Sequence, residues 1–186
     1  MVGRDVRVGN WSKRFMAAAV IQGLLVTILT LSAVVGQMYI KPEVSRVIAF
    51  GSAGTWFTIG YVMYVVVGVI GVAVSALFYH YLEYTLVAVY RGIARYFAWA
   101  HLVMMNAGVV GATWLMMYGG YEGAKAMLPA NVGGLGLTAA EAHEILAPLV
   151  MPITVFVMVL AIGVILGGIG FVITYRNALS TTRVAD

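Results

Sequence analysis

The chain has 186 residues, of which 62% are hydrophobic and only 10% are charged, and its mean hydropathy is +0.97. A soluble domain carries about 25% charged residues, so this composition excludes an ordinary soluble fold and indicates the lipid bilayer as the main partner. The net charge of +4 does not indicate nucleic acid, because the basic residues flank apolar segments instead of lining one face. The absence of cysteine excludes disulfides, thiolate metal sites and cysteine nucleophiles.

Four apolar runs follow one another along the chain, whose length permits a single domain over residues 1–186. The runs cover residues 15–38, 55–83, 97–118 and 139–175. Each is expected to cross the bilayer as a helix, since a crossing takes roughly 20 apolar residues. We therefore predict an all-α, polytopic protein of the cell membrane in which four transmembrane helices form an antiparallel bundle.

A glycine-rich stretch at residues 119–137 is expected to form the one long outer loop. After it, Thr138 and Glu141 have the spacing of a capping box, which predicts the start of a helix. Pro148 and Pro152 follow within that helix and predict a bend as it enters the membrane.

The distribution of basic residues predicts the orientation. If the N-terminus is cytoplasmic, eight of the 11 basic residues fall in inner segments, namely Arg4, Arg7, Lys13, Arg14, Arg91, Arg95, Arg176 and Arg183. The outer segments hold the other three, Lys41, Arg46 and Lys125. Because cytoplasmic segments carry an excess of Lys and Arg, both termini are expected to be cytoplasmic.

Few polar side chains lie inside the predicted spans. Gln22, Ser75 and Asn106 lie at similar depths near the midplane. A buried amide in hydrocarbon needs a partner, so we expect Gln22 and Asn106 to point inward and to form interhelical hydrogen bonds. No Asp, Glu, Lys or Arg lies in the core of a span, which argues against proton pumps and ion-coupled transporters.

Small residues within the spans predict close helix packing, with room for a flat cofactor as the alternative. They are Gly68 and Gly71 in the second span, Gly108, Gly111 and Ala112 in the third, and Gly163, Gly167, Gly168 and Gly170 in the fourth.

Two of the three histidines are expected in the inner leaflet, since His80 ends the second span and His101 begins the third. Imidazoles at similar depth on adjacent antiparallel helices suit the two axial positions of one haem b iron. Arg91 and Arg95 would then pair with the propionates. Glu83, one turn after His80, would orient its ring. The alternative is that both histidines simply bridge apolar and wet layers at the interface.

Other candidate ligands are the thioethers of Met63, Met104 and Met105, although methionine more often packs. His143 is expected on the outer side near Glu141 and Glu144. The spacing is not the Glu-x-x-His of carboxylate-bridged di-metal helices, so His143 is interpreted as an interfacial residue, with an outer metal or second haem site as the minority hypothesis.

A partial resemblance covers one helix of the four. The stretch at residues 99–121 reads WAHLVMMNAGVVGATWLMMYGGY. It resembles a helix of the catalytic subunit I of haem-copper oxidases and of its shorter relatives, in which a histidine near the helix entry precedes apolar residues and a Gly-x-x-Gly-like run. The resemblance implies that His101 is a metal ligand. Those enzymes have an adjacent histidine pair and a larger ligand set, whereas this chain has three separate histidines, which puts oxygen reduction in doubt.

These observations favour a membrane b-type haem protein that carries electrons or serves as an oxidase-related subunit, with haem between the second and third helices. An alternative is a non-catalytic subunit that docks on other membrane subunits or on its own copies. A third hypothesis is a small-molecule channel or transporter. No P-loop, nucleophile elbow or His-Glu-x-x-His motif supports a stand-alone enzyme.

Overall fold

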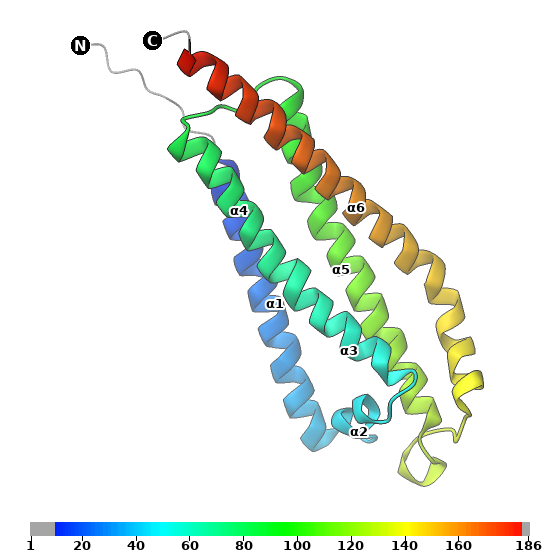
Figure 1. Ribbon diagram of the computed structural model, residues 1–186. Coiled ribbons are helices and arrows are strands. Elements are labelled where there is room, and N and C mark those ends of the chain that lie inside the picture. Colours follow the sequence, from blue (N-terminus) through cyan, green and yellow to red (C-terminus); the bar gives the residue numbers. More distant parts are fainter. Residues whose placement is uncertain (1–9, 184–186) are drawn as a thin grey trace.

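The computed structural model describes residues 10–183, and this part of the chain contains helices and turns but no strand (Figure 1). Arg4 and Arg7, which entered the charge count, lie outside the described residues, as does the side chain of Arg183. The all-α prediction is confirmed for the described part.

Four stretches of helix are long and apolar enough to cross a membrane, as predicted. The first is α1 (Trp11–Tyr39), and the third and fourth are α5 (Ile93–Met127) and α6 (Ala139–Arg183). The second span runs without interruption over Gly54–Thr85. It is divided into α3 (Gly54–Met63), η1 (Tyr64–Gly71), α4 (Val72–His80) and η2 (Tyr81–Thr85), where η1 and η2 are wider π-helical turns.

The connections are shorter and more structured than the sequence indicated. A short helix, α2 (Val44–Ala49), lies between α1 and α3, and a single 3₁₀ turn, η3 (Ala130–Val132), lies between α5 and α6. The start of α1 and the end of α6 lie at one end of the molecule, together with the turn at residues 86–92 (Figure 1). We call this the 86–92 end and the opposite one the 128–138 end.

The expected outer loop at residues 119–137 is too long, because α5 continues to Met127. The glycines that suggested a loop serve close packing instead. A Cβ on Gly120 would lie only 2.2 Å from the backbone nitrogen of Phe57 in α3, and one on Gly123 would lie 2.9 Å from the Cβ of Ala53. Hydrogen bonds from the Leu135 and Leu137 amides to the Ala126 carbonyl, each 3.1 Å, then fold the remaining connection tightly.

Glycines also bring α5 and α6 together along their length. A Cβ on Gly108 would lie 2.6 Å from the backbone nitrogen of Leu160, and one on Gly111 would lie 2.3 Å from the ring of Phe156. From the other side, a Cβ on Gly163 would meet Met104 at 2.8 Å. The expected packing role of these glycines is confirmed at these positions, because a larger residue would push the two helices apart.

The start of α6 has the predicted cap. The Thr138 amide and hydroxyl each donate to Glu141 Oε2 at 2.8 Å, and the Glu141 amide donates back to Thr138 Oγ1 at 3.3 Å. Pro148 and Pro152 lie inside the helix, and Figure 1 shows it changing direction in its first third, as predicted for a helix that loses backbone donors there.

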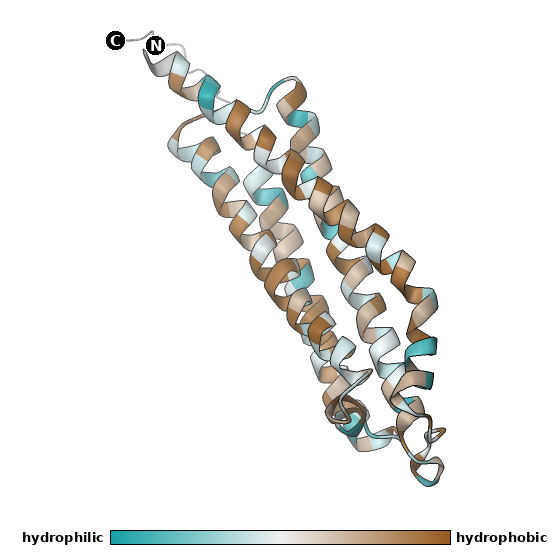
Figure 2. Cartoon of the chain, turned by 45° about the vertical axis from the view of Figure 1, so that its right-hand side comes forward, coloured by the Kyte–Doolittle hydropathy of each residue, from teal (hydrophilic) through white to brown (hydrophobic). Residues whose placement is uncertain are grey.

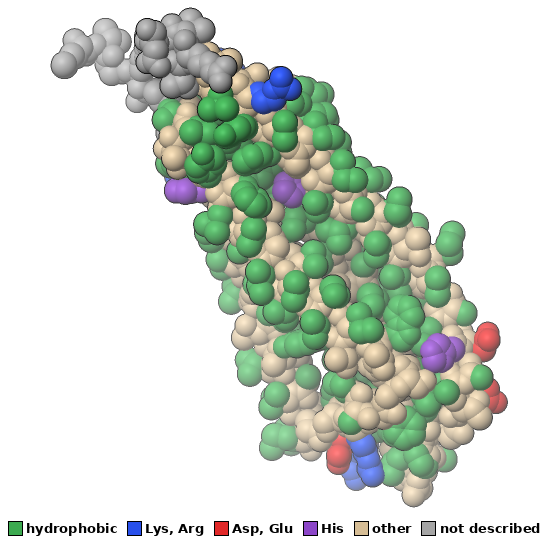
Figure 3. Space-filling view, viewed as in Figure 1, with side chains coloured by type: hydrophobic (Ala, Val, Ile, Leu, Met, Phe, Trp, Pro, Cys, Tyr) green, Lys and Arg blue, Asp and Glu red, His purple; other side chains and the backbone are tan. Residues whose placement is uncertain are grey.

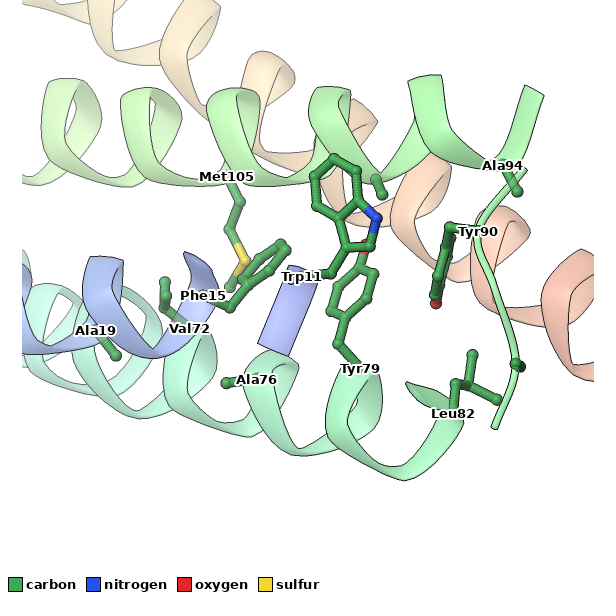
Figure 4. Close-up of a cluster of buried hydrophobic side chains, with 12 residues drawn as sticks. Trp11, Phe15, Ala19, Val72, Ala76, Tyr79, Leu82, Tyr90, Ala94 and Met105 are labelled. Carbon is green, nitrogen blue, oxygen red and sulfur yellow. The ribbon is translucent and has the colours of Figure 1, made fainter. Parts of the chain in front are cut away.

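An aromatic cluster packs the 86–92 end, where α1 meets α4 and α5 (Figure 4). Phe15 is fully buried and stacks on Tyr79 with a centroid distance of 4.6 Å. Trp11 packs edge-on against Trp99 at 5.2 Å, and Tyr79 lies 5.1 Å from Tyr90. Phe15 and Tyr79 of this cluster also contact the buried histidine described below.

Hydrophobic residues occur along the whole length of the long helices (Figure 2), and many of them are exposed. On the face shown in Figure 3, charged side chains gather toward the two ends and hydrophobic side chains fill the middle. In an apolar 18-residue stretch of each span, 11% is buried in α1 and in α6, whereas 39% is buried in α5. α5 is therefore the most enclosed of the four long helices, and α1 and α6 present broad faces outward.

Candidate functional site

His101 lies at the centre of the candidate site, on the third turn of α5. It is buried, with 8% of its surface exposed, and its ring lies 4.8 Å from that of Phe15. Nδ1 is 3.2 Å from the hydroxyl of Tyr79. Gly167 of α6 makes room for the imidazole, because a Cβ there would lie 2.3 Å from Nδ1. Three spans therefore fix the position of this ring.

The hydrogen bond of His101 leaves one ring nitrogen available. When the proton is on Nδ1, His101 donates to the Tyr79 oxygen and Nε2 keeps its lone pair. Within the described part of the chain, Nε2 has no hydrogen-bond partner and is not sealed from the surroundings. A histidine that ligates a metal is commonly held through its other nitrogen in this way.

A cavity of about 460 Å³ opens beside His101, and we call it the His101 cavity. Its volume falls in the roughly 300–1,000 Å³ range of small-molecule sites. Its walls come from the second, third and fourth spans and are mostly apolar. They are formed by Gly71, Val74, Ser75, Phe78, Tyr79, His101, Met105, Val164, Gly167, Gly168, Phe171 and Val172.

Three of the glycines noted in the sequence open this cavity. Gly71 and Gly167 stand in its walls, and a Cβ on Gly168 would meet nothing within 4 Å. Phe78 and Phe171 face each other edge-on at 5.9 Å across α4 and α6. Phe78 and Phe171 therefore form an aromatic wall of the cavity, beside the glycine backbone of α6.

His80 lies on a different face from His101. Its side chain is exposed and stacks on Tyr84 at 4.6 Å, and it lines a groove between α1 and α4. The adjacent residue, Tyr79, points to the buried side and contacts His101. The structure thus brings Tyr79, and not His80, to the predicted site.

The sequence did not reveal Tyr79 as the partner of His101, because histidine and tyrosine 22 positions apart form no recognisable motif. Their pairing depends on which way α4 is rotated about its axis.

Glu83 does not orient His80 as expected. It is buried, with 1% exposure, and accepts three hydrogen bonds from the first turn of α1. The Trp11 amide donates to Oε1 at 2.9 Å, and the Ser12 amide and hydroxyl donate to Oε2 at 3.1 and 2.8 Å. The carboxylate therefore caps a helix N-terminus across two spans, where its charge also suits the helix dipole.

Arg91 and Arg95, the two predicted propionate partners, also lie at different places in the structure. Arg91 lines a second cavity of about 510 Å³ at the 86–92 end, together with Ala88 and Thr174. Thr174 follows Phe171, a wall of the His101 cavity, by about one turn of α6, so the two cavities succeed one another along that helix. Arg95 is exposed and lines neither cavity.

The remaining candidate ligands have other surroundings. Met105 is buried in the wall of the His101 cavity, where it accepts a 3.7 Å hydrogen bond from Ser75. Met63 is exposed, and Met104 packs against Gly163. His143 is exposed, with Nδ1 2.7 Å from the Ala139 carbonyl. Over residues 10–183 no group of three or more His, Cys, Asp or Glu side chains is placed to hold a metal ion.

The polar residues near the midplane form the expected hydrogen bonds. Gln22 donates from Nε2 to Asn106 Oδ1 at 3.0 Å, and the Tyr64 hydroxyl donates to Gln22 Oε1 at 2.5 Å. Gln22 and Tyr64 are buried, and Asn106 is half-buried. This network links the first three spans and fixes their register, which is the structural role predicted for it. Ser75 is not part of this network: its hydroxyl lies 2.9 Å from the Gly71 carbonyl within the second span, and 3.7 Å from the Met105 sulfur.

Comparisons with models of protein families, with curated proteins and with solved structures find no match to this chain. Its function must therefore be inferred from its own residues and their arrangement.

Proposed function

We propose that the chain is a multi-pass b-type haem protein of the cell membrane, in which one haem b occupies the His101 cavity and His101 is its axial ligand. The proposal includes the predicted topology, an antiparallel four-helix arrangement with the 86–92 end and both termini on the cytoplasmic side. The observation that carries it is the buried imidazole, held by Tyr79 through Nδ1 with Nε2 unpaired, in the wall of an apolar cavity.

Further features of the cavity support this ligand. Histidine is a common axial ligand of haem iron, and cofactor sites of helical bundles form between facing helices. A Cβ on Gly168 would meet nothing within 4 Å, and the edge-on pair of Phe78 and Phe171 adds apolar rings to the wall of the cavity. Arg91 lies in the cavity that follows along α6 toward the 86–92 end, where a propionate would find a cation.

The proposal differs from a bis-histidine site. His80 lies on another face, and the walls that α4 and α6 give to the His101 cavity contain no histidine or methionine. Met105 lies one turn from His101 on the same helix and therefore on the same side of any bound ring. We expect a haem with a single ligand from this chain, and hence a high-spin spectrum, unlike the low-spin spectrum of a bis-histidine cytochrome.

The decisive experiment is the absorption spectrum of protein purified in mild detergent from a haem-replete host. We expect a Soret band and about one haem per chain by the pyridine haemochrome assay. His101→Ala should lose the band, and added imidazole should restore part of it, whereas the matched variants His80→Ala and His143→Ala should retain it. Circular dichroism and gel filtration show whether His101→Ala still folds, and Gly167→Ala provides a second variant that displaces the same imidazole.

A colourless wild-type protein would refute the haem proposal. So would a haem content that His101→Ala leaves unchanged in a folded protein. A low-spin spectrum that depends on both His80 and His101 would instead restore the bis-histidine arrangement.

A non-catalytic membrane subunit is the second candidate, supported by the broad apolar faces of α1 and α6. Gly163 and Gly167 pack internally, against Met104 and His101. Changing them therefore tests folding and not docking. Chemical crosslinking in native membranes, followed by separation of intact complexes, tests this candidate, which predicts a larger assembly that His80→Ala and His101→Ala leave intact.

A further inference from the structure

A groove of about 900 Å³ runs between α1 and α4 at the 86–92 end, on a different face from the His101 cavity. We propose that this groove binds an anionic phospholipid, whose phosphate contacts Lys13 and His80 and whose acyl chain lies along the two helices. The proposal does not depend on haem binding.

The groove is polar at the 86–92 end, which we call its head, and apolar along the rest of its length. A phospholipid has the same division into a polar headgroup and apolar chains. Its walls at the 86–92 end carry Lys13 from α1 and His80 and Tyr84 from the second span. Farther along come Met16 and Val20, at successive turns of α1. From Lys13 to Val20 the helix rises about 10 Å, enough to align the first part of an acyl chain with the apolar walls.

The head of the groove has the charge to prefer an anion. Lys13 is exposed, and the part of the chain that the structure describes gives it no ion pair. The adjacent Arg14 faces elsewhere, with its guanidinium 4.6 Å from the ring centroids of both Trp11 and Trp99. Basic pockets between membrane helices on the cytoplasmic side are known to bind anionic lipid headgroups.

Glu83, the carboxylate near the groove within residues 10–183, does not oppose this charge at the groove surface. Glu83 is 1% exposed, and its oxygens accept hydrogen bonds from Trp11 and Ser12. It is therefore directed into the protein. His80 and Tyr84, stacked at 4.6 Å, add an imidazole N–H and a phenol as hydrogen-bond donors beside the lysine ammonium.

Native mass spectrometry of the detergent-purified protein tests the proposal directly. We expect phosphatidylglycerol to be retained at least several-fold better than phosphatidylcholine with the same acyl chains. A lysine near the membrane surface contributes about 1 kcal/mol toward an anionic lipid, so Lys13→Gln should weaken retention about fivefold. His80→Gln should also weaken retention of phosphatidylglycerol. Lys41→Gln, a matched change at the 128–138 end, should have no effect on it.

Two additional experiments distinguish binding of the whole lipid from binding of its phosphate group alone. Inorganic phosphate at millimolar concentration should not displace the lipid, because it lacks the acyl chain. Ala17→Trp, which fills the groove without touching its charges, should lower retention of phosphatidylglycerol. Equal retention of the two lipids, or unchanged retention in both Lys13→Gln and His80→Gln, would overturn the proposal, as would full displacement by phosphate alone.

Discussion

Glu83 gives the sharpest test of how the helices are held together. Its carboxylate is buried and accepts three hydrogen bonds from the first two residues of α1. Glu83→Ala leaves the Trp11 and Ser12 amides without their acceptor at a helix end. Bonds to charged groups contribute roughly 1.5–3 kcal/mol each before the cost of burying the charge, and loss of a cap costs about 1 kcal/mol. We therefore expect Glu83→Ala to destabilise the protein by about 3 kcal/mol.

Glu83→Gln tests what the charge of the carboxylate contributes to stability, because glutamine has nearly the same size and shape as glutamate. Glutamine has one acceptor oxygen, and its amide group presents N–H donors where a carboxylate oxygen accepted. The expected loss is about 2 kcal/mol, which is between a tenfold and a hundredfold change in the unfolding equilibrium. The control is Glu122→Gln, which removes a partly exposed ion pair with Lys125 at 3.4 Å and should cost less than about 0.5 kcal/mol.

Unfolding in mixed micelles with increasing sodium dodecyl sulfate measures all three variants, with far-UV circular dichroism as the signal. Hydrogen exchange at the Trp11 and Ser12 amides gives the local readout and should accelerate in both Glu83 variants. If Glu83→Gln matches the wild type in stability and exchange, the ionised carboxylate is not what secures α1. If Glu122→Gln loses as much stability as Glu83→Ala, the burial of the carboxylate does not determine how much stability its removal costs.

The remaining predictions concern packing, the midplane network and the α6 cap. Gly120→Ala should destabilise by about 1–3 kcal/mol in the same unfolding assay, because the added Cβ overlaps the α3 backbone, whereas Gly23→Ala, whose Cβ would lie 3.9 Å from the Val69 side chain, should change little. A double-mutant cycle of Gln22→Ala and Asn106→Ala should give a coupling of about 0.6 kcal/mol and no more than about 1.7, and additive losses would contradict the interhelical bond. Thr138→Ala should cost about 1 kcal/mol and speed hydrogen exchange in the first turn of α6 only; faster exchange throughout α6 would contradict a local cap.

The sequence predicted the positions of residues along the helices better than the rotation of each helix about its axis. Run lengths and depth counts placed the four spans and brought Gln22 and Asn106 to the same level, where they form a hydrogen bond. The faces of a membrane helix, however, are apolar toward lipid and toward protein alike, so no periodic pattern reveals which side is buried. Tyr79 and His80 are sequence neighbours, yet the first is 3% exposed and the second faces outward.

The end of α5 could not be located for a related reason. Gly119, Gly120 and Gly123 were interpreted as loop residues because glycine favours turns in an isolated segment. Their actual role depends on the backbone of another helix, which approaches so closely at Gly120 that no side chain fits. The capping box at Thr138 was predictable because its hydrogen bonds involve residues only three positions apart.

The bond between Glu83 and α1 also bears on the order of events during synthesis. The acceptor lies 72 positions after Trp11, so α1 is synthesised well before the carboxylate that completes its first turn. Until the second span is nearly finished, the Trp11 and Ser12 amides must be satisfied by water or lipid headgroups. The contact therefore ties the first turn of α1 to the end of the second span, and it can form only when both are present.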